Sequence, residues 1–423
     1  MKRYLIIGNS AAGVNAAATI RANDKTCSIK IISSETFNSY GRPLISYYLN
    51  GKIKPENIYY RDENFYKSSN IEVLLNTKVE KIDTIKKEII VDLGEKIGYD
   101  KLLIATGSNP FIPPIKNLNF NRQKNVFTFL TYNDSIKLKE KITKNSKVVI
   151  AGAGLIGLKA AEGLFGQVAS ITVIDLADRV MASVLDKSEA DIIQAHIEQR
   201  FISFKLQTSI CEVQGGSNVS GVSLSNGETL KCDILIIAVG VRPNIALAKE
   251  AGIKTLKGIV VDEYMQTSIK DIYAAGDCVE FSDLLSDESK VFALWSNASS
   301  QGEVAGLNMT KIKTKAPKAL AMNSISFFGL QLISAGIISN SKSGNNFICS
   351  VKNKLRKLNI FNDNLIGFVL INDNQRAGIY TSLISDKTKL STLSYDITSR
   401  DIGFNVYSKD ERTRKIWDYK GGY

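Results

Sequence analysis

The pattern of hydrophobic and polar positions repeats once along the chain. An apolar strand, a glycine-rich turn and a helix of small residues begin at Tyr4 and again at Val148. The first stretch reads YLIIGNSAAGVNAAATIRAN and continues into SIKIISSE; the second reads VVIAGAGLIGLKAAEGLF and continues into SITVIDLADR. A strand, a helix and a second strand in this order form a βαβ unit with parallel strands. The sequence therefore predicts two α/β domains, each built on a parallel sheet covered by helices.

The pattern changes in the rest of the chain. Strand and turn signals alternate over Ile71–Asp92, and the dipeptide Asn226–Gly227 predicts a hairpin turn. From about Met322 onward, strand-like runs such as FICSV and LIGFVLI end in a helical stretch. We expect a separate, small α+β domain there, followed by a polar and aromatic tail whose role stays open.

The first glycine-rich turn has the spacing of a dinucleotide-binding loop. Gly8, Ser10 and Gly13 stand at the G-x-G-x-x-G positions, and Ser10 replaces the middle glycine. Such a turn lets the backbone approach a pyrophosphate, which then meets the free N–H groups at a helix N-terminus. Glu35 follows at the end of the next strand, where a carboxylate can accept ribose hydroxyls.

The second turn has all three glycines, Gly152, Gly154 and Gly157, and Asp175 ends its second strand. A carboxylate there accepts the 2′-hydroxyl of the adenosine ribose and repels a 2′-phosphate. Positions 176 and 177 carry no arginine or lysine to bind that phosphate. We therefore expect NADH to be preferred over NADPH.

The few cysteines and the single histidine limit the catalytic chemistry that the side chains can supply. Cys211 and Cys232, the closest of the five cysteines, are 21 residues apart, which argues against a disulfide from neighbouring cysteines and against a protein-borne iron–sulfur or zinc site. No metal site is predicted. The single histidine, His196, lies in a helix-like stretch and is expected on the surface, so histidine-based acid–base catalysis is disfavoured.

The net charge of +12 admits nucleic acid, an anionic membrane or an acidic protein as partners. Lysines cluster at Lys311–Lys318 and Lys352–Lys357 without any nucleic-acid-binding signature. These clusters are either ordinary solvated surface or a docking face for an acidic protein. The chain begins without signal-peptide features and has no apolar run of about 20 residues. We expect a cytoplasmic protein that does not insert into membranes.

Three further segments carry a family resemblance: YDKLLIATGSNP (Tyr99–Pro110), CDILIIAVGVRPN (Cys232–Asn244) and TSIKDIYAAGDC (Thr267–Cys278). They resemble conserved segments of flavoprotein oxidoreductases that bind two dinucleotides. The resemblance implies FAD and NAD as cofactors and a glutathione-reductase-like architecture. It divides the chain into a discontinuous FAD domain (1–114 and 244–320), an NAD domain (115–243), a C-terminal α+β domain (321–395) and a tail (396–423).

The resemblance also indicates a branch of the family. Tyr40 stands where thiol-dependent members carry a cysteine, and a phenol forms neither a mixed disulfide nor a sulfenic acid. The segment YGRPLISYYL instead resembles the YxRPxLS pattern of rubredoxin reductases, ferredoxin reductases and the flavin portion of nitrite reductases. The runs Asn323–Gly336 and Leu365–Tyr380 resemble the C-terminal domain of the same group.

The resemblance implies a role for several single residues. Arg42 is expected to bind the FAD pyrophosphate, Pro43 to shape the flavin wall, and Asp277 to hold the ribitol chain. The helix that begins near Trp295 is expected to face the pyrimidine edge of the flavin. The complete set of expected cofactor contacts is Gly8, Ser10, Ala11, Ala12, Gly13, Glu35, Arg42, Pro43, Ala105, Thr106, Gly107, Gly152, Gly154, Leu155, Ile156, Gly157, Asp175, Gly240, Gly276, Asp277, Trp295 and Gln301.

Two positions depart from the family pattern. Tyr47 stands where many relatives carry a lysine near the reactive flavin nitrogen, and Lys159 stands where they carry a glutamate. We hypothesise that Lys159 supplies the positive charge near the flavin or the nicotinamide; the alternative is that it points to solvent.

The expected function is electron transfer between NAD(H) and an external acceptor through FAD, without a redox-active cysteine. The branch and the basic surface favour a small, acidic iron–sulfur protein of the rubredoxin or ferredoxin type. The alternatives are a flavin subunit of a larger metalloenzyme complex resembling nitrite reductase, an NADH oxidase or diaphorase, and a redox-sensing NAD-binding flavoprotein. The direction of electron flow and the oligomeric state, including a dimer or a larger complex, stay open.

Overall fold

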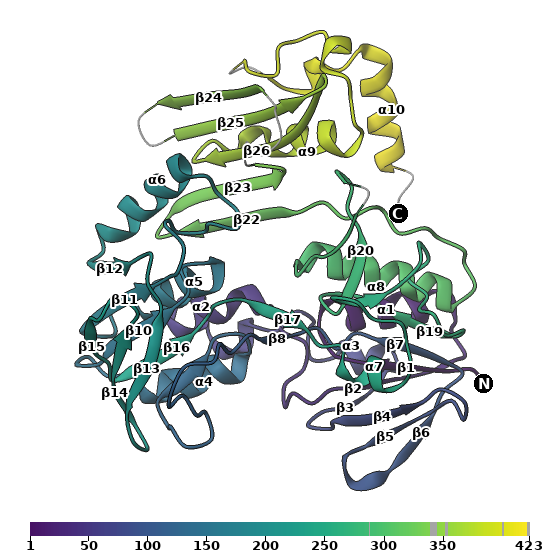
Figure 1. Cartoon of the computed structure of the whole chain (residues 1–423). Helices are drawn as coiled ribbons and strands as arrows, with labels where there is room; N and C mark the ends of the chain where they lie inside the picture. The colour runs from purple at the N-terminus through teal and green to yellow at the C-terminus, as the bar shows by residue number, and fades with distance from the viewer. Residues whose placement is uncertain (287, 339–344, 352–353, 400–401, 421–423) are drawn as a thin grey trace. The chain divides into compact units, whose positions relative to one another are not determined.

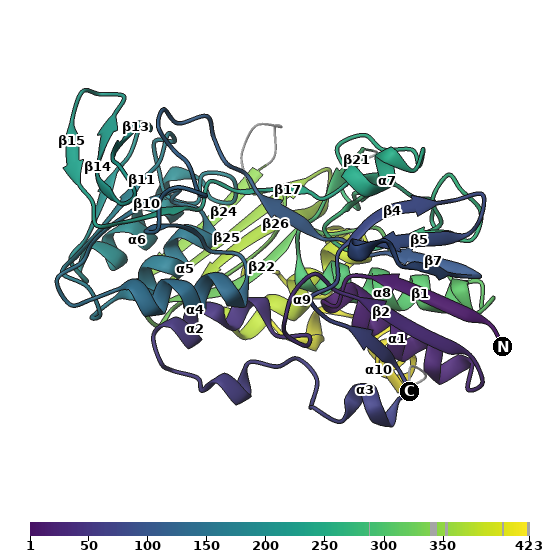
Figure 2. The same ribbon diagram turned by 90° about the horizontal axis from the view of Figure 1, so that it is seen from below.

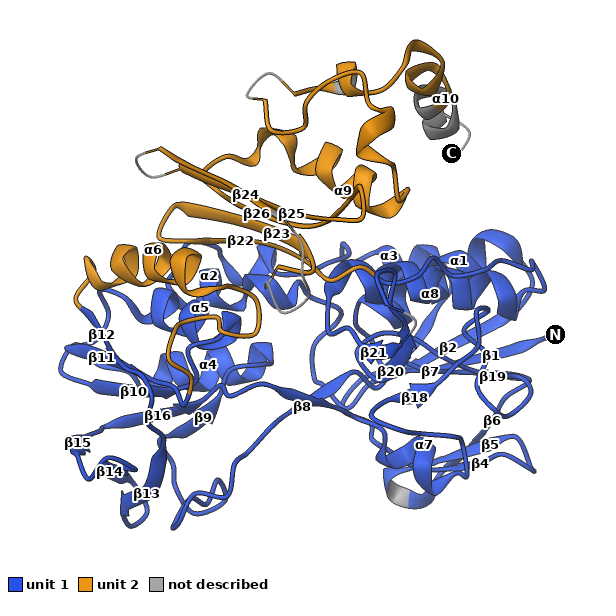
Figure 3. Cartoon of the chain, turned by 45° about the horizontal axis from the view of Figure 1, so that its top comes forward, with its two compact units in different colours: residues 1–176, 202–319 blue, residues 177–201, 320–423 orange. Residues whose placement is uncertain are grey.

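The computed structural model describes residues 1–286, 288–338, 345–351, 354–399 and 402–420. The chain divides into two compact units (Figure 3). The first comprises residues 1–176 and 202–319, and the second comprises residues 177–201 and 320–423.

The first unit contains two parallel sheets, and the first of them is built around the N-terminal strand (Figure 1 and Figure 2). Its central residues Ile6, Ile31 and Leu103 are fully buried. All its neighbouring strands run parallel, and its last strand comes from a segment far along the chain. The strand order is β19 (Ile272–Ala274), β7 (Lys101–Ile104), β1 (Arg3–Ile7), β2 (Ser28–Ile32) and β3 (Glu72–Leu74).

Two helices of this sheet pack unusually close together. Helix α1 (Ala11–Asn23) connects β1 to β2, and α8 (Trp295–Met309) lies against it. A Cβ atom at Gly302 would stand 2.2 Å from the carbonyl oxygen of Ala12, and one at Gly306 would stand 2.9 Å from that of Ala16. Glycine at both positions therefore allows the backbones of α1 and α8 to touch.

The second sheet repeats the first. Its central strand is joined to the next by α5 (Leu155–Leu164), and α4 (Tyr132–Lys141) follows its edge strand. All its neighbouring strands are parallel. The strand order is β12 (Ile202–Lys205), β11 (Ser170–Ile174), β10 (Lys147–Ala151), β16 (Ile234–Ile237) and β9 (Val126–Thr128). Both predicted βαβ units are thus confirmed.

Smaller elements complete the first unit. The antiparallel pair β8 (Ser108–Pro110) and β17 (Val241–Pro243) carries the chain between the two parallel sheets. The predicted hairpin turn at Asn226–Gly227 is confirmed, since it joins two paired strands and Gly227 has a φ of +85°. The remaining strands form three three-stranded sheets: β4 (Val79–Asp83), β5 (Glu88–Val91) and β6 (Lys96–Gly98); β13 (Ile210–Gly215), β14 (Val219–Leu224) and β15 (Thr229–Lys231); β18 (Ile259–Val260), β20 (Val279–Ser282) and β21 (Ser289–Val291). The short helices are α2 (Ile45–Leu49), α3 (Phe65–Ser68) and α7 (Ala246–Glu250).

The second unit is an antiparallel sheet with helices, as the α+β prediction requires. Helix α9 (Ala377–Ser385) packs on this sheet, where Tyr380 contacts Phe368. Helix α6 (Lys187–Glu198) belongs to the same unit, although it lies between β11 and β12 in sequence. The strand order is β22 (Met322–Phe327), β23 (Leu330–Gly336), β26 (Asn364–Ile371), β25 (Lys354–Phe361) and β24 (Asn345–Val351).

The tail is folded in its described part. Ile402 and Val406 are fully buried, and α10 (Lys409–Lys420) ends it. Residues 400–401 and 421–423 lie outside the described residues. The predicted domain boundaries themselves stay predictions.

The expectation that the lysine cluster at 352–357 is exposed is wrong in part. Lys357 was expected on the surface, but its side chain is 3% exposed and its Nζ lies 2.6 Å from Asp186 and 3.2 Å from Glu189. Arg356 beside it is also buried and pairs with Asp373. Lys352 of the same cluster lies outside the described residues. The segment 352–357 therefore adds less exposed charge than its composition suggests.

His196 is partly exposed, which is compatible with its expected place on the surface. It is half-buried on α6, and its Nε2 atom lies 3.3 Å from the carbonyl oxygen of Phe328 within the second unit. Its helical setting is as predicted.

Candidate functional site

The first glycine-rich turn lies between β1 and α1. Gly8 has a φ of +115°, and its N–H donates to the carbonyl of Ile32. A Cβ at Gly8 would stand 2.0 Å from the carbonyl oxygen of Ala105 at the end of β7, so only glycine fits there. Ser10 is the N-cap of α1. A Cβ at Gly13 would stand 2.0 Å from the carbonyl oxygen of Gly8, so glycine is needed there as well. The first N–H groups of α1, beginning at Ala11, therefore lie at the carboxyl edge of the sheet, where they have no acceptor within the helix.

The second turn has the same geometry with one informative difference. Gly152 has a φ of +111°, and a Cβ there would stand 2.3 Å from the carbonyl oxygen of Ala238. A Cβ at Gly157 would stand 1.9 Å from the carbonyl oxygen of Gly152. Gly154, the N-cap of α5, has an ordinary φ of −81°, and a Cβ there would meet no protein atom within 4 Å. The fold therefore demands glycine at 152 and 157, whereas Gly154 leaves open space in front of the helix.

The two acids follow the predicted strands, Asp175 directly and Glu35 three residues after β2 ends at Ile32. Asp175 directly follows β11, and its Oδ2 accepts a 2.6 Å hydrogen bond from the N–H of Ala153 in the glycine-rich turn. Leu176 beside it is 73% exposed. Leu155 and Ile156, the first residues of α5, are half-buried next to this turn. The turn, the helix start and the carboxylate thus converge at one edge of the second sheet.

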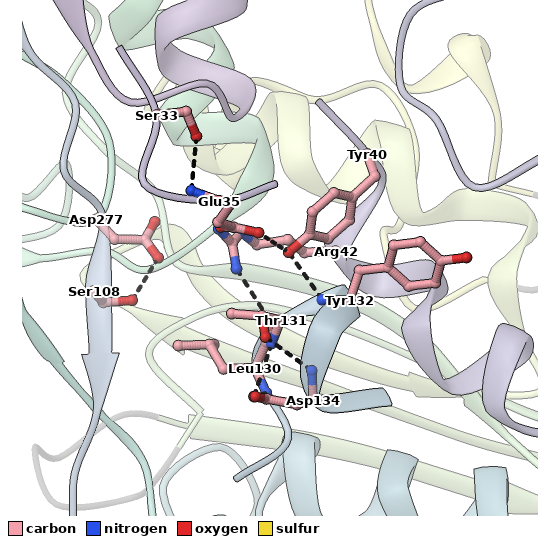
Figure 4. A network of polar contacts seen from close by, with 10 residues as sticks. All are labelled: Ser33, Glu35, Tyr40, Arg42, Ser108, Leu130, Thr131, Tyr132, Asp134 and Asp277. Carbon is pink, nitrogen blue, oxygen red and sulfur yellow. Dashed lines mark hydrogen bonds and ion pairs between the residues drawn. The ribbon is translucent and has the colours of Figure 1, made fainter. Parts of the chain in front are cut away.

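Glu35 lies in a denser network than the sequence suggested (Figure 4). One of its carboxylate oxygens pairs with Arg42, and the other accepts a 2.6 Å hydrogen bond from the hydroxyl of Tyr40. The Nη1 atom of Arg42 also donates to the carbonyl of Leu130 at 3.1 Å. Arg42 begins a short 3-10 helix in which Pro43 is exposed.

Asp277 faces the same region. The hydroxyl of Ser108 donates to its Oδ2 at 3.1 Å (Figure 4). Burial raises the pKa of Asp277, against the opposing effects of Ser108 and of the charge on Arg42. Gly276 before it has a φ of +88° and donates its N–H to Gln301 of α8 at 2.9 Å. This hydrogen bond ties the aspartate turn to α8.

The remaining expected contacts lie around these groups. Thr106 donates to the carbonyl of Asn244 at 2.7 Å, and Gly107 accepts from the N–H of Asn244, at the start of the crossing segment. Gly240 accepts from Phe111 on the return crossing. Ala12 contacts Gly276 and Gly302 where α1 meets α8. Trp295 begins α8, and its ring packs edge-on against Tyr60 with centroids 5.0 Å apart.

The structure brings Tyr47 and Lys159 together. The Nζ of Lys159 lies 4.4 Å from the centroid of the Tyr47 ring, and it pairs with Glu162 one turn further along α5. The Lys159 side chain is 12% exposed, so it does not point to solvent. Lys52 approaches the same pair, 5.7 Å from the ring centroid and 4.0 Å from Glu162. The half-buried Lys159 thus connects α2 to α5.

Among the partners in this site that the sequence did not point to are Tyr132, Ser108, Leu130 and Glu162. Tyr132, Ser108 and Leu130 lie far from their partners in sequence, and no local signal pointed to them. Glu162 lies three residues after Lys159 on a helix, so the helical period could have identified it.

The cysteines offer no activated thiol among the buried positions. Burial raises the pKa of Cys278 to about 11 and that of Cys232 to about 12, so both stay protonated at neutral pH. Burial also raises the pKa of Cys27. Cys211 is exposed and Cys349 is half-buried. The described residues contain no group of three or more His, Cys, Asp or Glu side chains that could hold a metal ion.

The site fits two dinucleotides. Both turns place a helix N-terminus, a backbone cradle that a Cβ would fill, and a carboxylate at the carboxyl edge of a parallel sheet. The buried Nδ2 of Asn9, next to the first cradle, has no hydrogen-bond partner in the described part of the chain. An orphaned buried donor beside an open helix end suits an anionic or oxygen-rich ligand.

Two such halves define an oxidoreductase that binds two dinucleotides. Residues 2–302 match the pyridine nucleotide-disulphide oxidoreductase family, and the chain belongs to that family. Residues 322–388 match the C-terminal domain of rubredoxin NAD+ reductase. The chain is an NAD(P)H-dependent FAD oxidoreductase, with FAD and NAD as its cofactors, as the sequence predicted.

Individual relatives differ in activity. The chain is 37% identical to an NADH oxidase of Methanocaldococcus jannaschii, over 74% of this chain and 71% of the relative. It is 31% identical to a rubredoxin-NAD(+) reductase of Pseudomonas putida, over 74% and 81%. It is 30% identical to the nitrite reductase [NAD(P)H] of Bacillus subtilis over 93% of this chain, and spans about half (48%) of that protein's length.

Among solved structures, a ferredoxin reductase from Rhodopseudomonas palustris matches with a TM-score of 0.83 and 26% identity. The match covers 92% of this chain and 96% of the other. Within the described residues, none of the helices has the length and apolar character needed to cross a membrane.

Proposed function

We propose that this chain transfers electrons between NADH and a small, acidic iron–sulfur protein, and that no cysteine takes part. The observation that carries the proposal is the match of residues 322–388 to the rubredoxin NAD+ reductase C-terminal domain. A rubredoxin-NAD(+) reductase and a ferredoxin reductase among the similar proteins support it. Tyr40 at the position expected for a redox cysteine supports the absence of thiol chemistry.

FAD, when bound, supplies the hydride acceptor and the store of two electrons. The protein residues hold and orient it. The start of α1 and the guanidinium of Arg42 would face its pyrophosphate, and Glu35 would accept ribose hydroxyls. Asp277 would hold the ribitol chain, and the start of α8 at Trp295 would stabilise negative charge at the pyrimidine edge.

NADH would bind at the second turn. The start of α5 would face its pyrophosphate across the open space at Gly154, and Asp175 would accept its adenosine ribose. Hydride transfer needs the nicotinamide and the flavin held in contact, so the protein contributes orientation and electrostatics rather than a reacting group.

Lys159 would supply the positive charge near the reacting rings. We expect Lys159→Met, which keeps the apolar stem over Tyr47, to slow hydride transfer from NADH about tenfold, because a cation that stabilises developing negative charge is lost. Stopped-flow flavin reduction measures the rate. Lys52→Met is the matched control, since Lys52 approaches the same ring and the same glutamate with a 55% exposed side chain. A wild-type rate in Lys159→Met, with normal flavin content, contradicts this role.

The net charge of +12 favours an acidic partner. We expect kcat/KM for a rubredoxin or ferredoxin to fall about tenfold between about 50 mM and about 0.5 M salt, because salt screens attraction between exposed charges. Reduction of a small neutral quinone should change far less and serves as the control. Equal salt dependence for both acceptors argues against electrostatic docking.

Two other functions have specific support. The Methanocaldococcus relative favours an NADH oxidase, and the half-length match to the Bacillus nitrite reductase favours a subunit of a larger enzyme. Steady-state NADH oxidation with rubredoxin, with a two-iron ferredoxin and with oxygen as sole acceptor separates the three. The proposal expects a carrier to exceed oxygen; oxygen as the best acceptor favours the oxidase, and slow turnover with every acceptor favours a missing subunit.

A further inference from the structure

Tyr40 connects two parts of the first unit through a single hydroxyl group (Figure 4). Its side chain is buried, at 4% exposure. The hydroxyl donates to Glu35 Oε2 at 2.6 Å and accepts from the backbone N–H of Tyr132 at 3.0 Å. Glu35 follows β2 of the first parallel sheet, and Tyr132 begins α4, which follows β9 of the second.

Arg42 makes a second connection between the same two places. Its guanidinium pairs with Glu35 Oε1 and donates to the carbonyl of Leu130 at 3.1 Å. Both carboxylate oxygens of Glu35 are therefore linked to the start of α4. We call Glu35, Tyr40 and Arg42 the Glu35 bridge.

A helix cap stabilises the far end of the Glu35 bridge. Thr131 and Asp134 form a reciprocal capping box at the start of α4, and Asp134 also accepts from the N–H of Leu130 at 2.9 Å. The N–H of Tyr132 belongs to the first helical turn and has no intrahelical acceptor. The Tyr40 hydroxyl supplies that acceptor, so removing it leaves a buried donor unpaired.

Packing alone does not explain a tyrosine at this position. The Tyr40 ring contacts the Tyr132 ring with centroids 5.7 Å apart, and the Arg42 guanidinium lies 5.4 Å from the ring centroid of Tyr40. A phenylalanine would keep both contacts. It would lose the hydroxyl, which links the carboxylate of Glu35 to the N–H of Tyr132 beside the link that Arg42 makes to Leu130.

We propose that Tyr40 is a positioning residue that orients the Glu35–Arg42 pair for FAD and couples this pair to the start of α4. The proposal rests on the placement of FAD at Glu35 and Arg42 made under the proposed function. It assigns to Tyr40 a role in cofactor affinity and in the order of the α4 start, and no role in redox chemistry.

The test compares Tyr40→Phe with Tyr48→Phe. Tyr48 packs edge-on against the Tyr132 ring, with centroids 4.9 Å apart, and lies outside the Glu35 bridge. Titration of apoprotein with FAD, followed by flavin fluorescence, should show about tenfold weaker binding in Tyr40→Phe and wild-type binding in Tyr48→Phe. Hydrogen exchange of the apoprotein should show about tenfold faster exchange at residues 130–134 in Tyr40→Phe only.

A double-mutant cycle with Glu35→Gln provides the second measurement. If Tyr40 acts through Glu35, its substitution should weaken FAD binding far less in the Glu35→Gln background, with a coupling of about fivefold or more. Additive effects, or wild-type FAD affinity in Tyr40→Phe, overturn the proposal. Because apoprotein exchange and FAD affinity are measured without any acceptor, these results stay separate from the outcome of the electron-carrier tests.

Discussion

Gly154→Ala is expected to lower kcat/KM for NADH about a hundredfold while leaving the protein folded and loaded with FAD. The added Cβ meets no protein atom within 4 Å and the backbone φ of −81° suits any residue, so the fold tolerates it. The methyl group instead enters the space through which a pyrophosphate would reach the start of α5. A displacement of about 1 Å in a bound substrate can cost about a hundredfold in rate.

Gly157→Ala is the matched comparison, because its Cβ would stand 1.9 Å from the carbonyl oxygen of Gly152. We expect this variant to lose about 3 kcal/mol of unfolding free energy, since the helix must move from the strand. Gly154→Ala should lose no more than about 1 kcal/mol, the usual range for an N-cap substitution. Thermal unfolding and NADH-dependent flavin reduction measure both effects. Unchanged NADH kinetics in Gly154→Ala would show that the pyrophosphate does not lie there.

The double substitution Asp175→Asn with Leu176→Arg is expected to shift the preference between NADPH and NADH about a thousandfold toward NADPH. Asparagine keeps an acceptor for the N–H of Ala153 and removes the negative charge that repels a 2′-phosphate. Leu176 is 73% exposed beside it, so an arginine there can reach that phosphate without unfolding the site.

The ratio of kcat/KM for the two coenzymes measures the shift in preference. Each of the two charge changes should contribute roughly half of the shift in free energy. Asp175→Asn with Leu176→Gln is the control, and it should lose the discrimination against NADPH without gaining a phosphate contact. An unchanged ratio in the arginine variant contradicts the placement of the adenosine ribose at Asp175.

The sequence predicted those parts of the fold that follow from short-range chemistry. The turns at Gly8 and Gly152 need positive φ angles, and apolar strands precede both. Each turn can therefore be recognised from about thirty consecutive residues of the sequence. The carboxylates Glu35 and Asp175 can be recognised in the same stretch of sequence, because each lies within three residues of the end of the second strand of its βαβ unit.

Contacts between distant segments could not be predicted in this way. Tyr40 and Tyr132 are 92 residues apart, and Ser108 and Asp277 are 169 residues apart, so only the packed fold brings them together. The sequence identified Tyr40 as unusual but gave no reason for its hydroxyl. The structure supplies one, since the hydroxyl connects Glu35 to the start of α4.

Charge patterns along the chain were also an uncertain guide to the surface. Lys357 lies in a lysine-rich segment, yet it is buried against Asp186 and Glu189, which lie about 170 residues earlier on or beside α6. Lys159 was expected either near the reacting rings or in solvent. Its Glu162 and Tyr47 partners show that it is held between α2 and α5.

The most direct test of the account is a single-turnover experiment without oxygen. The protein is alkylated with iodoacetamide, reduced with NADH, and mixed with oxidised rubredoxin while flavin and carrier absorbance are followed. We expect rapid flavin reoxidation with matching reduction of rubredoxin, at the same rate as in the protein that was not alkylated. Loss of carrier reduction on alkylation, or a reduced flavin that rubredoxin does not reoxidise, would contradict a thiol-independent transfer of electrons to an iron–sulfur protein.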